Sequence, residues 1–565
     1  MTADKRVPFG ECSSHMLRQF GGSRLKMPDW FCREKPDWLV MVLLVLLAAA
    51  VRVYSLRFCH VISTDGTGYV SAARAVSQGE LSGIGFSGFY PLLVWMASRL
   101  VGDFELAGRL VSLVCGSLLV VPLYLLGRDL FSRRVALCAA LVAVVWPPLV
   151  SSSCEVMTQA SYNLLQLSGI YLVWRMFSRP TPVRGGLAGA CLGVAYLTRP
   201  EGILLFVTLP LPLLLCYRDI LSDRRVPVAY VAAFLVPFLF NMLLVHNLTG
   251  EWQLSAKTDS ALNDALSYYL NLPDLNYAPG YEPKGYLEII RDYPGFLPHN
   301  IARNLAETWR TILPPWFWVL SAVGFLSSGF SRRMVAKNGF ILSALAPFAV
   351  LIVFYYVGGY ADPYLPYLFL WGANGLLIIE GKLLGVVSRG NPGGGESTSG
   401  MFRPAVALAA CYSLALFIPQ VRADVPDSAY HYSMDNGRRD EKHIGLVLKE
   451  NLPPGKIMTR WARIAFYAER EWVNIPAGVG LESALQAGAE AGARYFVADG
   501  FLHANRPALG REIFEPLVSQ EVPYGEYVMT DPEKRINGLK PVFLFVDPNS
   551  AGVVVYEIPP LSGGG

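Results

Sequence analysis

The first 423 residues alternate between long apolar runs and short polar breaks. A helix of roughly 20 apolar residues is long enough to cross the hydrocarbon core of a bilayer. Runs of about this length lie at 38–56, 106–127, 134–152, 158–177, 184–198, 203–217, 227–246, 311–329, 339–357, 363–383 and 404–421. The pattern therefore predicts a polytopic α-helical protein with about eleven transmembrane helices.

Two shorter patterns complete the expected architecture. Gly66 to Gln78 and Tyr90 to Val101 read as helices too short to span, and the second is apolar on one face, which is typical of a helix lying along the membrane surface. After residue 424 the chain becomes charged, and alternating helix and strand patterns predict a small α/β domain over 424–565. Its expected elements are a helix at Arg438 to Glu450 and strands at Lys456 to Thr459, Tyr495 to Ala498, Val542 to Val546 and Val553 to Ile558.

Composition agrees with a membrane protein, because 53% of the residues are hydrophobic and only 16% are charged. The basic residues set the expected orientation, since short cytoplasmic loops are enriched in Lys and Arg. Fifteen Lys and Arg residues lie in the loops on one side of the predicted membrane. The three short loops on the other side contain only one basic residue, Arg199. This bias predicts a multi-pass plasma (inner) membrane protein with a cytoplasmic N-terminus and an extracytoplasmic, periplasmic C-terminal domain.

Five segments follow from this topology. Residues 1–36 form a cytoplasmic tail, too long and polar for the start of a cleaved signal peptide, and 37–423 form the membrane domain. Within the latter, 57–105 and 247–310 face outward, and the Gly/Ser-rich stretch 384–402 is a cytoplasmic linker. The net charge of +4 is mostly this topological signal, so no nucleic-acid partner is expected.

The nine cysteines are scattered, and they predict neither a disulfide framework nor a cysteine metal site. Cys59 and Cys154 form a pair assigned to the outer side. Sequence alone does not place them within bonding distance.

Two acidic residues are the candidates for chemistry. Asp65 lies just after the first apolar run, at the mouth of the membrane region, and a carboxylate there suits a general base that deprotonates an acceptor. The structural alternative is a helix cap, because Ser63, Thr64 and Asp65 all suit that role. Glu155, in the short outer loop after the third run, is the second candidate, either orienting the acceptor beside Asp65 or lying solvated in its loop.

Basic residues on the outer side are the candidates for binding an anion. Arg199 lies in a tight turn between two apolar runs. A charged side chain is costly next to the membrane, which predicts a phosphate or carboxylate partner for Arg199. The alternative is a local ion pair with Glu201 or Glu155. Arg109 is a similar candidate at the outer end of the second run, and Lys257 follows in the next outer segment, where a simple surface role is the alternative.

At these residues the chain resembles the GT-C superfamily of membrane glycosyltransferases, in particular the branch of polyprenyl-phosphate-mannose protein mannosyltransferases and lipid A aminoarabinose transferases. The similarity lies in the shared order of short motifs through most of the membrane part. These are Asp65 with Tyr69, Tyr90 to Leu93, Arg109-Leu110, Leu126 to Phe131, Pro147-Pro148 to Thr158, and Leu197 to Gly202.

The resemblance implies transfer of a sugar from a polyprenyl-phosphate donor to a lipid, glycan or protein acceptor on the outer face, with inversion and with Asp65 as base. Tyr69, Arg109, Arg199, Glu201, Lys257 and Arg303 are the expected substrate-binding residues. Membrane lipids are the other expected partner. No cofactor is required, and a role for a divalent cation is left open.

The chain departs from the family pattern in three places. Gly66 stands where many relatives have a second acid, and Gln159 stands where they often have Glu after Thr158. The basic residue usual before the segment Gly358 to Tyr364 is missing, so Arg199 is the first expected contact of the donor phosphate, followed by Lys257 and Arg303. Two other functions stay open: a transporter or flippase of lipid-linked sugars, and an inactive scaffold of the same fold.

Overall fold

The computed structural model describes most of the chain between residues 37 and 559. The described ranges are 37–80, 88–216, 223–256, 258–272, 275–327, 332–355, 358–389, 404–421 and, with short gaps, 439–559. The expected N-terminal tail, most of the Gly/Ser-rich linker, and Lys257 lie outside the described residues.

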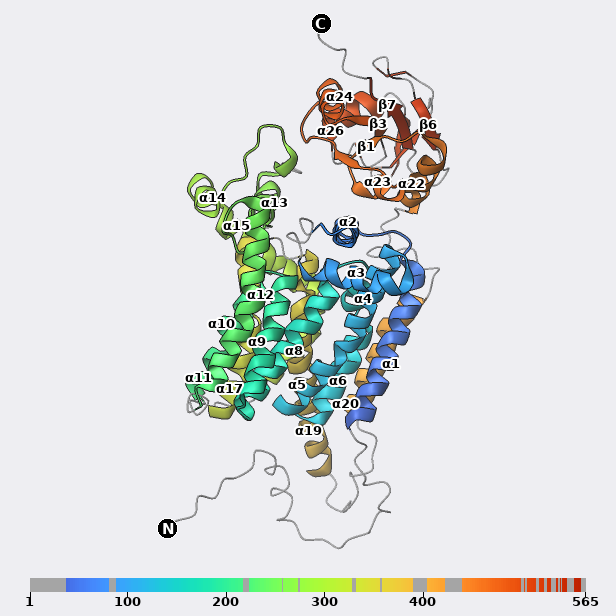
Figure 1. The fold of residues 1–565 in the computed structure, drawn as a ribbon. Helices are drawn as coiled ribbons and strands as arrows, with labels where there is room; N and C mark the ends of the chain where they lie inside the picture. The colour runs from blue at the N-terminus through green and yellow to red at the C-terminus, as the bar shows by residue number, and fades with distance from the viewer. Residues whose placement is uncertain are drawn as a thin grey trace. The chain divides into compact units, whose positions relative to one another are not determined.

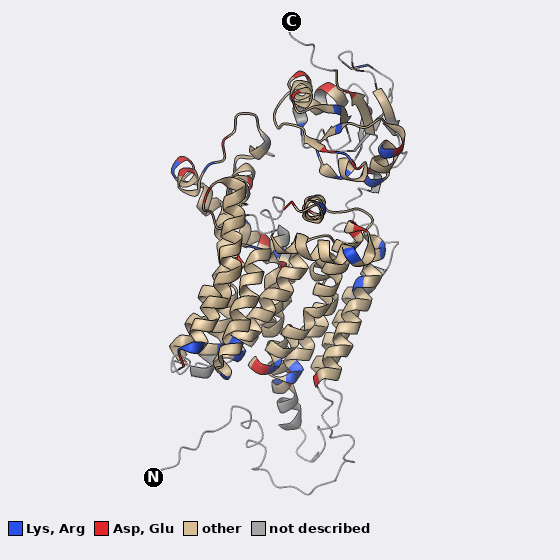
Figure 2. Cartoon of the chain, in the orientation of Figure 1, with Lys and Arg blue, Asp and Glu red and all other residues tan. Residues whose placement is uncertain are grey.

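Helices form at every apolar run that the sequence pattern indicates (Figure 1). They are α1 (Asp37–Ser55), α4 (Phe104–Leu118), α5 (Val120–Leu130), α6 (Arg133–Val145), α7 (Pro147–Cys154), α8 (Thr158–Ser178), α9 (Pro182–Thr198), α10 (Gly202–Thr208), α11 (Pro210–Cys216), α12 (Arg225–Thr249), α16 (Pro315–Leu326), α17 (Arg332–Ala344), α18 (Ala346–Phe354), α19 (Leu365–Arg389) and α20 (Pro404–Val421). Figure 2 shows that their charged residues gather at the helix ends, which is the distribution a bilayer demands.

Among the described residues, three helical stretches are individually long and apolar enough to cross a membrane: Asp37–Phe58, Phe104–Leu130 and Arg225–Thr249. Two bent pairs, α6 with α7 and α17 with α18, reach that length only together, which makes up to five spans. The bend between α6 and α7 is 55°, and it falls at Pro147, whose ring cannot continue a helix from the preceding turn. The number of about eleven spans stays a prediction.

Close helix contacts in the bundle depend on small residues. On α9, Gly185, Gly189 and Gly193 follow a four-residue spacing, and a Cβ atom on Gly189 would lie 2.0 Å from the carbonyl oxygen of Tyr230 in α12. Such a stripe lets two helix backbones approach closely, a common device in membranes. The helix pair α9–α12 therefore packs closely within the large apolar core.

Shorter elements cover the ends of the bundle helices. They are η2 (Leu56–Phe58), α2 (Thr64–Ser77), α3 (Phe89–Val101), α13 (Thr258–Leu270), η5 (Leu275–Tyr277), α14 (Tyr286–Asp292), α15 (Phe296–Glu307), the π-helical η6 (Thr308–Ile312) and the 3-10 segment η7 (Gly358–Tyr364). The helix α3 is amphipathic as predicted: Tyr90 and Val94 are buried, whereas Leu100 is 88% exposed. An exposed leucine on a helix beside the bundle suits contact with lipid.

The C-terminal region contains the four strands predicted from the sequence, within a mixed five-stranded sheet of order β2-β1-β3-β7-β6. Strands β2, β1 and β3 are parallel, and β7 is antiparallel to both β3 and β6. The elements of this region are α22 (Arg439–Asn451), β1 (Lys456–Thr459), α23 (Ala462–Tyr467), β2 (Trp472–Asn474), α24 (Leu481–Glu490), β3 (Ala493–Ala498), α26 (Pro507–Leu509), η8 (Gly510–Phe514), the hairpin β4 (Val518–Val522) and β5 (Glu526–Met529), β6 (Pro541–Phe545) and β7 (Val553–Glu557).

Alternation along β3 explains how this sheet is covered. Tyr495 and Val497 pack with residues of α22 and α23 on one face, whereas Phe496 and Ala498 pack with residues of α24 on the other. Successive side chains of a strand point to opposite faces, so a strand buried on both sides is apolar throughout. The helix α23 therefore packs against one face of the sheet.

Candidate functional site

Asp65 lies in the first turn of α2, and its carboxylate does not cap this helix, which was the structural alternative left open by the sequence. The cap of α2 is Ser63, whose hydroxyl accepts a hydrogen bond from the Gly66 backbone nitrogen at 3.1 Å. Asp65 itself is exposed, and its carboxylate makes no hydrogen bond or ion pair with another described residue.

The start of α2 lies directly against the loop between α7 and α8. The Ser63 hydroxyl donates to the Val156 carbonyl oxygen at 3.4 Å. A Cβ atom on Gly66 would lie 2.9 Å from the same oxygen and 2.8 Å from Ile62 Cγ1, which is closer than real Cβ contacts come. Glycine is therefore required at position 66 for this packing, and the packing brings the loop that contains Glu155 next to Asp65.

Two half-buried acids accompany Asp65. Burial raises the pKa of Glu155 to about 7, and the neighbouring charges of Asp362 and Asp65 act in the same direction. Burial likewise raises the pKa of Asp362 in η7 to about 7, although the Arg199 guanidinium acts against this shift. Near neutral pH both acids are therefore partly protonated and can donate as well as accept hydrogen bonds.

Arg199 is the basic residue of this acidic cluster. It follows the last turn of α9, is only 7% exposed, and pairs with Glu201 at 3.0 Å, as one of the structural alternatives predicts. Its guanidinium also lies over the rings of Tyr162 and Tyr360, at 5.5 and 4.9 Å from their centroids. A cation held by two rings and one carboxylate is already positioned before a ligand binds.

Two buried polar atoms next to Arg199 have no hydrogen-bond partner among the described residues. They are the second carboxylate oxygen of Glu201 and the hydroxyl of Tyr162. A buried polar group without a partner is costly, and it commonly marks a place where a ligand or water binds. The surroundings of Arg199 can therefore accept a polar ligand, with the Tyr162 hydroxyl available as a donor and the Glu201 oxygen as an acceptor.

Tyr69 connects α2 to α8 rather than facing solvent. Its side chain is hydrogen-bonded to that of Thr158, the first residue of α8, and it interacts electrostatically with Asp65. Its ring meets that of Tyr90 edge to face, with the centroids 5.4 Å apart. The structure thus brings Asp65, Glu155, Tyr69, Arg199 and Glu201 into one cluster.

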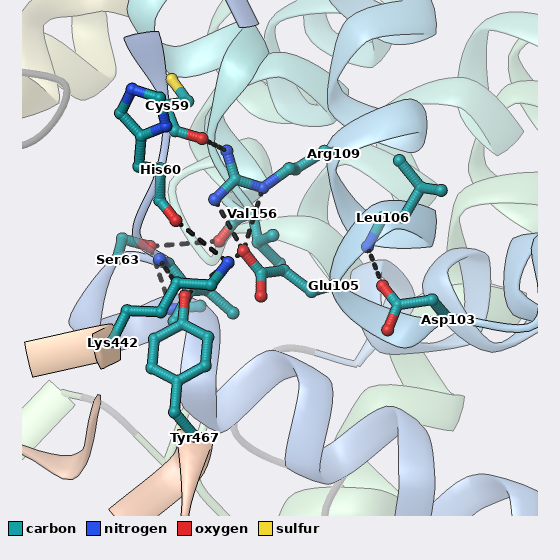
Figure 3. A network of polar contacts seen from close by, with 12 residues as sticks. Cys59, His60, Ser63, Asp103, Glu105, Leu106, Arg109, Val156, Lys442 and Tyr467 are labelled. Atoms are coloured by element: carbon teal, nitrogen blue, oxygen red, sulfur yellow. Dashed lines mark hydrogen bonds and ion pairs between the residues drawn. The ribbon is translucent and has the colours of Figure 1, made fainter. Parts of the chain in front are cut away.

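Arg109 belongs to a different network, drawn in Figure 3. Its guanidinium donates to Glu105 at 2.7 Å and to the Cys59 carbonyl oxygen at 2.7 Å. These contacts tie α4 to the segment that leads from α1 toward Asp65. Arg109 therefore acts on protein groups in this structure, and its expected contact with substrate stays a prediction.

The C-terminal region contacts the same segment through α23. The Tyr467 hydroxyl accepts a hydrogen bond from the Ile62 backbone nitrogen at 2.8 Å and donates to Glu105 at 3.4 Å (Figure 3). Arg463 donates to the Thr64 hydroxyl at 2.9 Å, and Lys442 donates to the His60 carbonyl oxygen at 3.2 Å. Residues 60–64, immediately before Asp65, are thus held from both sides.

Arg303, the remaining described candidate, lies outside the cluster. It is on α15, where its guanidinium contacts Asn304 and lies over the Tyr268 ring at 5.6 Å. Conversely, Asp362, Tyr162 and Tyr360 were not among the residues predicted for the site. Asp362 had a signal, because it is an acid in a short loop assigned to the outer side, but the two tyrosines had none beyond their residue type.

Among the described residues, no group of three or more His, Cys, Asp or Glu side chains is placed to hold a metal ion. The acids of the cluster alternate with tyrosines and Arg199 instead. This arrangement suits proton transfer and anion binding.

Comparisons with known proteins bear on the fold. Residues 89–245 match the family described as dolichyl-phosphate-mannose-protein mannosyltransferase. Among curated proteins, none matches the sequence significantly.

Two solved structures show how far the fold extends. ArnT from Cupriavidus metallidurans bound to undecaprenyl phosphate is similar over 94% of this chain and 99% of its own, with a TM-score of 0.54 and 14% identity. The archaeal oligosaccharyltransferase AglB from Archaeoglobus fulgidus, in complex with an inhibitory peptide and a dolichol-phosphate, is similar over 89% of this chain and 75% of its own, with a TM-score of 0.52 and 14% identity. The chain therefore has the fold of these two solved structures, and it resembles the protein mannosyltransferase family and ArnT.

Proposed function

We propose that this protein is an integral-membrane glycosyltransferase that moves a sugar from a polyprenyl-phosphate donor to an acceptor on the outer face of the plasma membrane. The observation that carries the proposal is the state of Asp65. Its helix is capped by Ser63, its carboxylate is exposed and unpaired among the described residues, and it lies beside two acids and a buried arginine. A carboxylate in this state is ready to accept a proton.

The reaction assigned to this site breaks the bond between the anomeric carbon and the lipid phosphate oxygen. The acceptor oxygen forms a new bond to that carbon from the opposite face, which inverts its configuration. The acceptor proton passes to Asp65, and Glu155 orients the acceptor by a hydrogen bond. The polyprenyl phosphate leaves with the electron pair of the broken bond.

Arg199 stabilises the departing phosphate in this proposal. Charge develops on the phosphate as the bond breaks, and a cation already fixed by two rings and Glu201 needs little reorganisation to meet it. Polyprenyl phosphates are the lipids bound in the similar ArnT and AglB structures. That likeness supports the choice of donor, and the exposed apolar side chains of α3 support a donor that stays in the membrane.

The test is sugar transfer in membranes or detergent from radiolabelled polyprenyl-phosphate sugars. Asp65→Asn should lose transfer by about 10²–10⁴-fold while keeping expression and thermal stability, because it removes only the base. The matched control is Asp103→Asn, an acid-to-amide change at an exposed cap of α4, where asparagine caps equally well. Transfer retained in Asp65→Asn would reduce that residue to a surface position, and no transfer from any donor would favour a transporter or a scaffold.

A further inference from the structure

The two cysteines at the outer ends of α1 and α7 lie against each other. Cys59 follows η2 in the first outer segment, and Cys154 is the last residue of α7. Both are buried thiols, 7% and 0% exposed, and their side chains are hydrogen-bonded to one another. The Cys154 thiol also donates to the Arg52 carbonyl oxygen at the end of α1, at 3.5 Å.

Contacts other than those of the sulfur atoms hold the two segments in place. Arg109 binds the Cys59 carbonyl oxygen at 2.7 Å, and the Ser63 hydroxyl binds the Val156 carbonyl oxygen at 3.4 Å. The approach of the two thiols therefore follows from the packing of the loops. The other described cysteines lie within helices: Cys115, Cys138, Cys191, Cys216 and Cys411.

We propose that Cys59 and Cys154 are joined by a disulfide bond in the mature protein. The two thiols lose their hydrogens and form one S–S bond, and two protons and two electrons pass to a disulfide of an extracytoplasmic thiol-oxidising protein, which becomes a dithiol. The proposal rests on the outward orientation of both segments, because that compartment is oxidising whereas the cytoplasm keeps thiols reduced. It does not require the proposed transferase activity.

The surroundings of the pair indicate a structural bond rather than a redox switch. The hydrogen bond to Cys154 and burial both raise the pKa of the Cys59 thiol, so the reactive thiolate is scarce in the folded protein. The bond therefore forms before the loops pack, and it is afterwards shielded from small reductants. It links the segment leading to Asp65 with the loop of Glu155.

The test is the redox state of the two cysteines in protein purified from a host with an oxidising extracytoplasmic compartment. The protein is denatured, treated with N-ethylmaleimide without reductant, digested and analysed by mass spectrometry. The expected result is a linked pair of peptides containing Cys59 and Cys154, with Cys115, Cys138 and Cys191 alkylated. Alkylation of both Cys59 and Cys154 in the same sample overturns the proposal.

A variant pair tests the structural role. Cys59→Ala with Cys154→Ala should lower the thermal unfolding midpoint in detergent by roughly 5 °C or more, because the cross-link no longer restricts the unfolded chain. Cys115→Ala with Cys191→Ala removes two half-buried thiols from helices, and it should lower the midpoint less. Equal losses in the two double variants would show that only packing volume was removed, which contradicts a cross-link.

Discussion

Arg109 and Arg199 are both buried arginines near helix ends, yet the structure uses them differently. Arg109 gives its hydrogen bonds to Glu105 and to the Cys59 backbone, and Glu105 is in turn bound by Tyr467. Arg199 has one acid partner, which keeps an unpaired buried oxygen, and two tyrosine rings. A polar network whose donors and acceptors are all paired stabilises the fold. A network that keeps unpaired buried polar atoms is able to bind a ligand.

The largest expected effect separates these two networks by activity. Arg199→Gln should lower the rate of sugar transfer by about 10²–10³-fold, because the leaving phosphate loses its preorganised cation. Glu201 also loses its ion pair, so the unfolding midpoint should fall as well, and steady-state kinetics of the folded variant with the radiolabelled donor measures the loss of transfer. A variant with full activity would remove Arg199 from the site.

The same substitution at the other arginine should act on stability. Arg109→Gln leaves the half-buried carboxylate of Glu105 without its ion pair, which should cost about 3 kcal/mol of unfolding free energy. Thermal unfolding in detergent measures the cost, and the KM for the donor should stay unchanged. If KM rises instead with stability preserved, Arg109 contacts substrate and the two arginines are alike.

The pH dependence of stability tests the two half-buried acids of the site, Glu155 and Asp362. The folded-state pKa values of Glu155 and Asp362 are raised to about 7, so the native state retains protons that the unfolded chain releases. Stability should therefore fall as pH rises from about 4 to 7, with the loss complete above that range. Glu155→Gln and Asp362→Asn should flatten this dependence, whereas Glu251→Gln, at an exposed acid, should leave it unchanged.

A smaller effect is expected where the C-terminal region contacts the satisfied network. Tyr467→Phe removes the acceptor of the Ile62 backbone nitrogen, which should cost about 1–2 kcal/mol and lower kcat more than KM by loosening the segment before Asp65. Tyr495→Phe is the matched control, because its hydroxyl binds Pro453 within the C-terminal region. Equal kcat losses in both variants would contradict a positioning role for Tyr467.

The smallest effect is expected at Arg303. It lies on α15 against Asn304 and Tyr268, so Arg303→Gln should change transfer by less than about twofold. The same radiolabelled assay measures it. A large rise in the KM for the donor would extend the site to α15 and weaken the contrast between the two arginines.

Sequence patterns predicted the helices and strands better than the site. Apolar periodicity placed α2, α3 and the strands β1, β3, β6 and β7 to within a few residues, because burial of one or both faces leaves a direct mark on residue type. The number of spans is harder to predict from the same pattern. A run such as 134–152 reads as one helix, whereas Pro147 divides it into α6 and α7 at 55°.

Within the site, sequence selected the charged residues but not their partners. Asp65, Glu155 and Arg199 stood out because charge at a membrane surface is costly. Which rings enclosed Arg199 depended on contacts between segments far apart in the chain, whereas Ser63, Thr64 and Asp65 all suited the cap of α2 and the sequence did not rank them. The choice of Ser63 over Asp65 as the cap was such a detail, and it decided whether the carboxylate was free.

The close contact at Gly66 has a consequence for how this protein can change over evolution. At position 66, the Val156 carbonyl oxygen lies 2.9 Å from where a Cβ atom would be. An acid introduced at this position alone would push the Glu155 loop away from Asp65. A second acid at 66 and the present position of Glu155 are therefore mutually exclusive, so a lineage could move between the two arrangements only by coordinated substitutions in both loops.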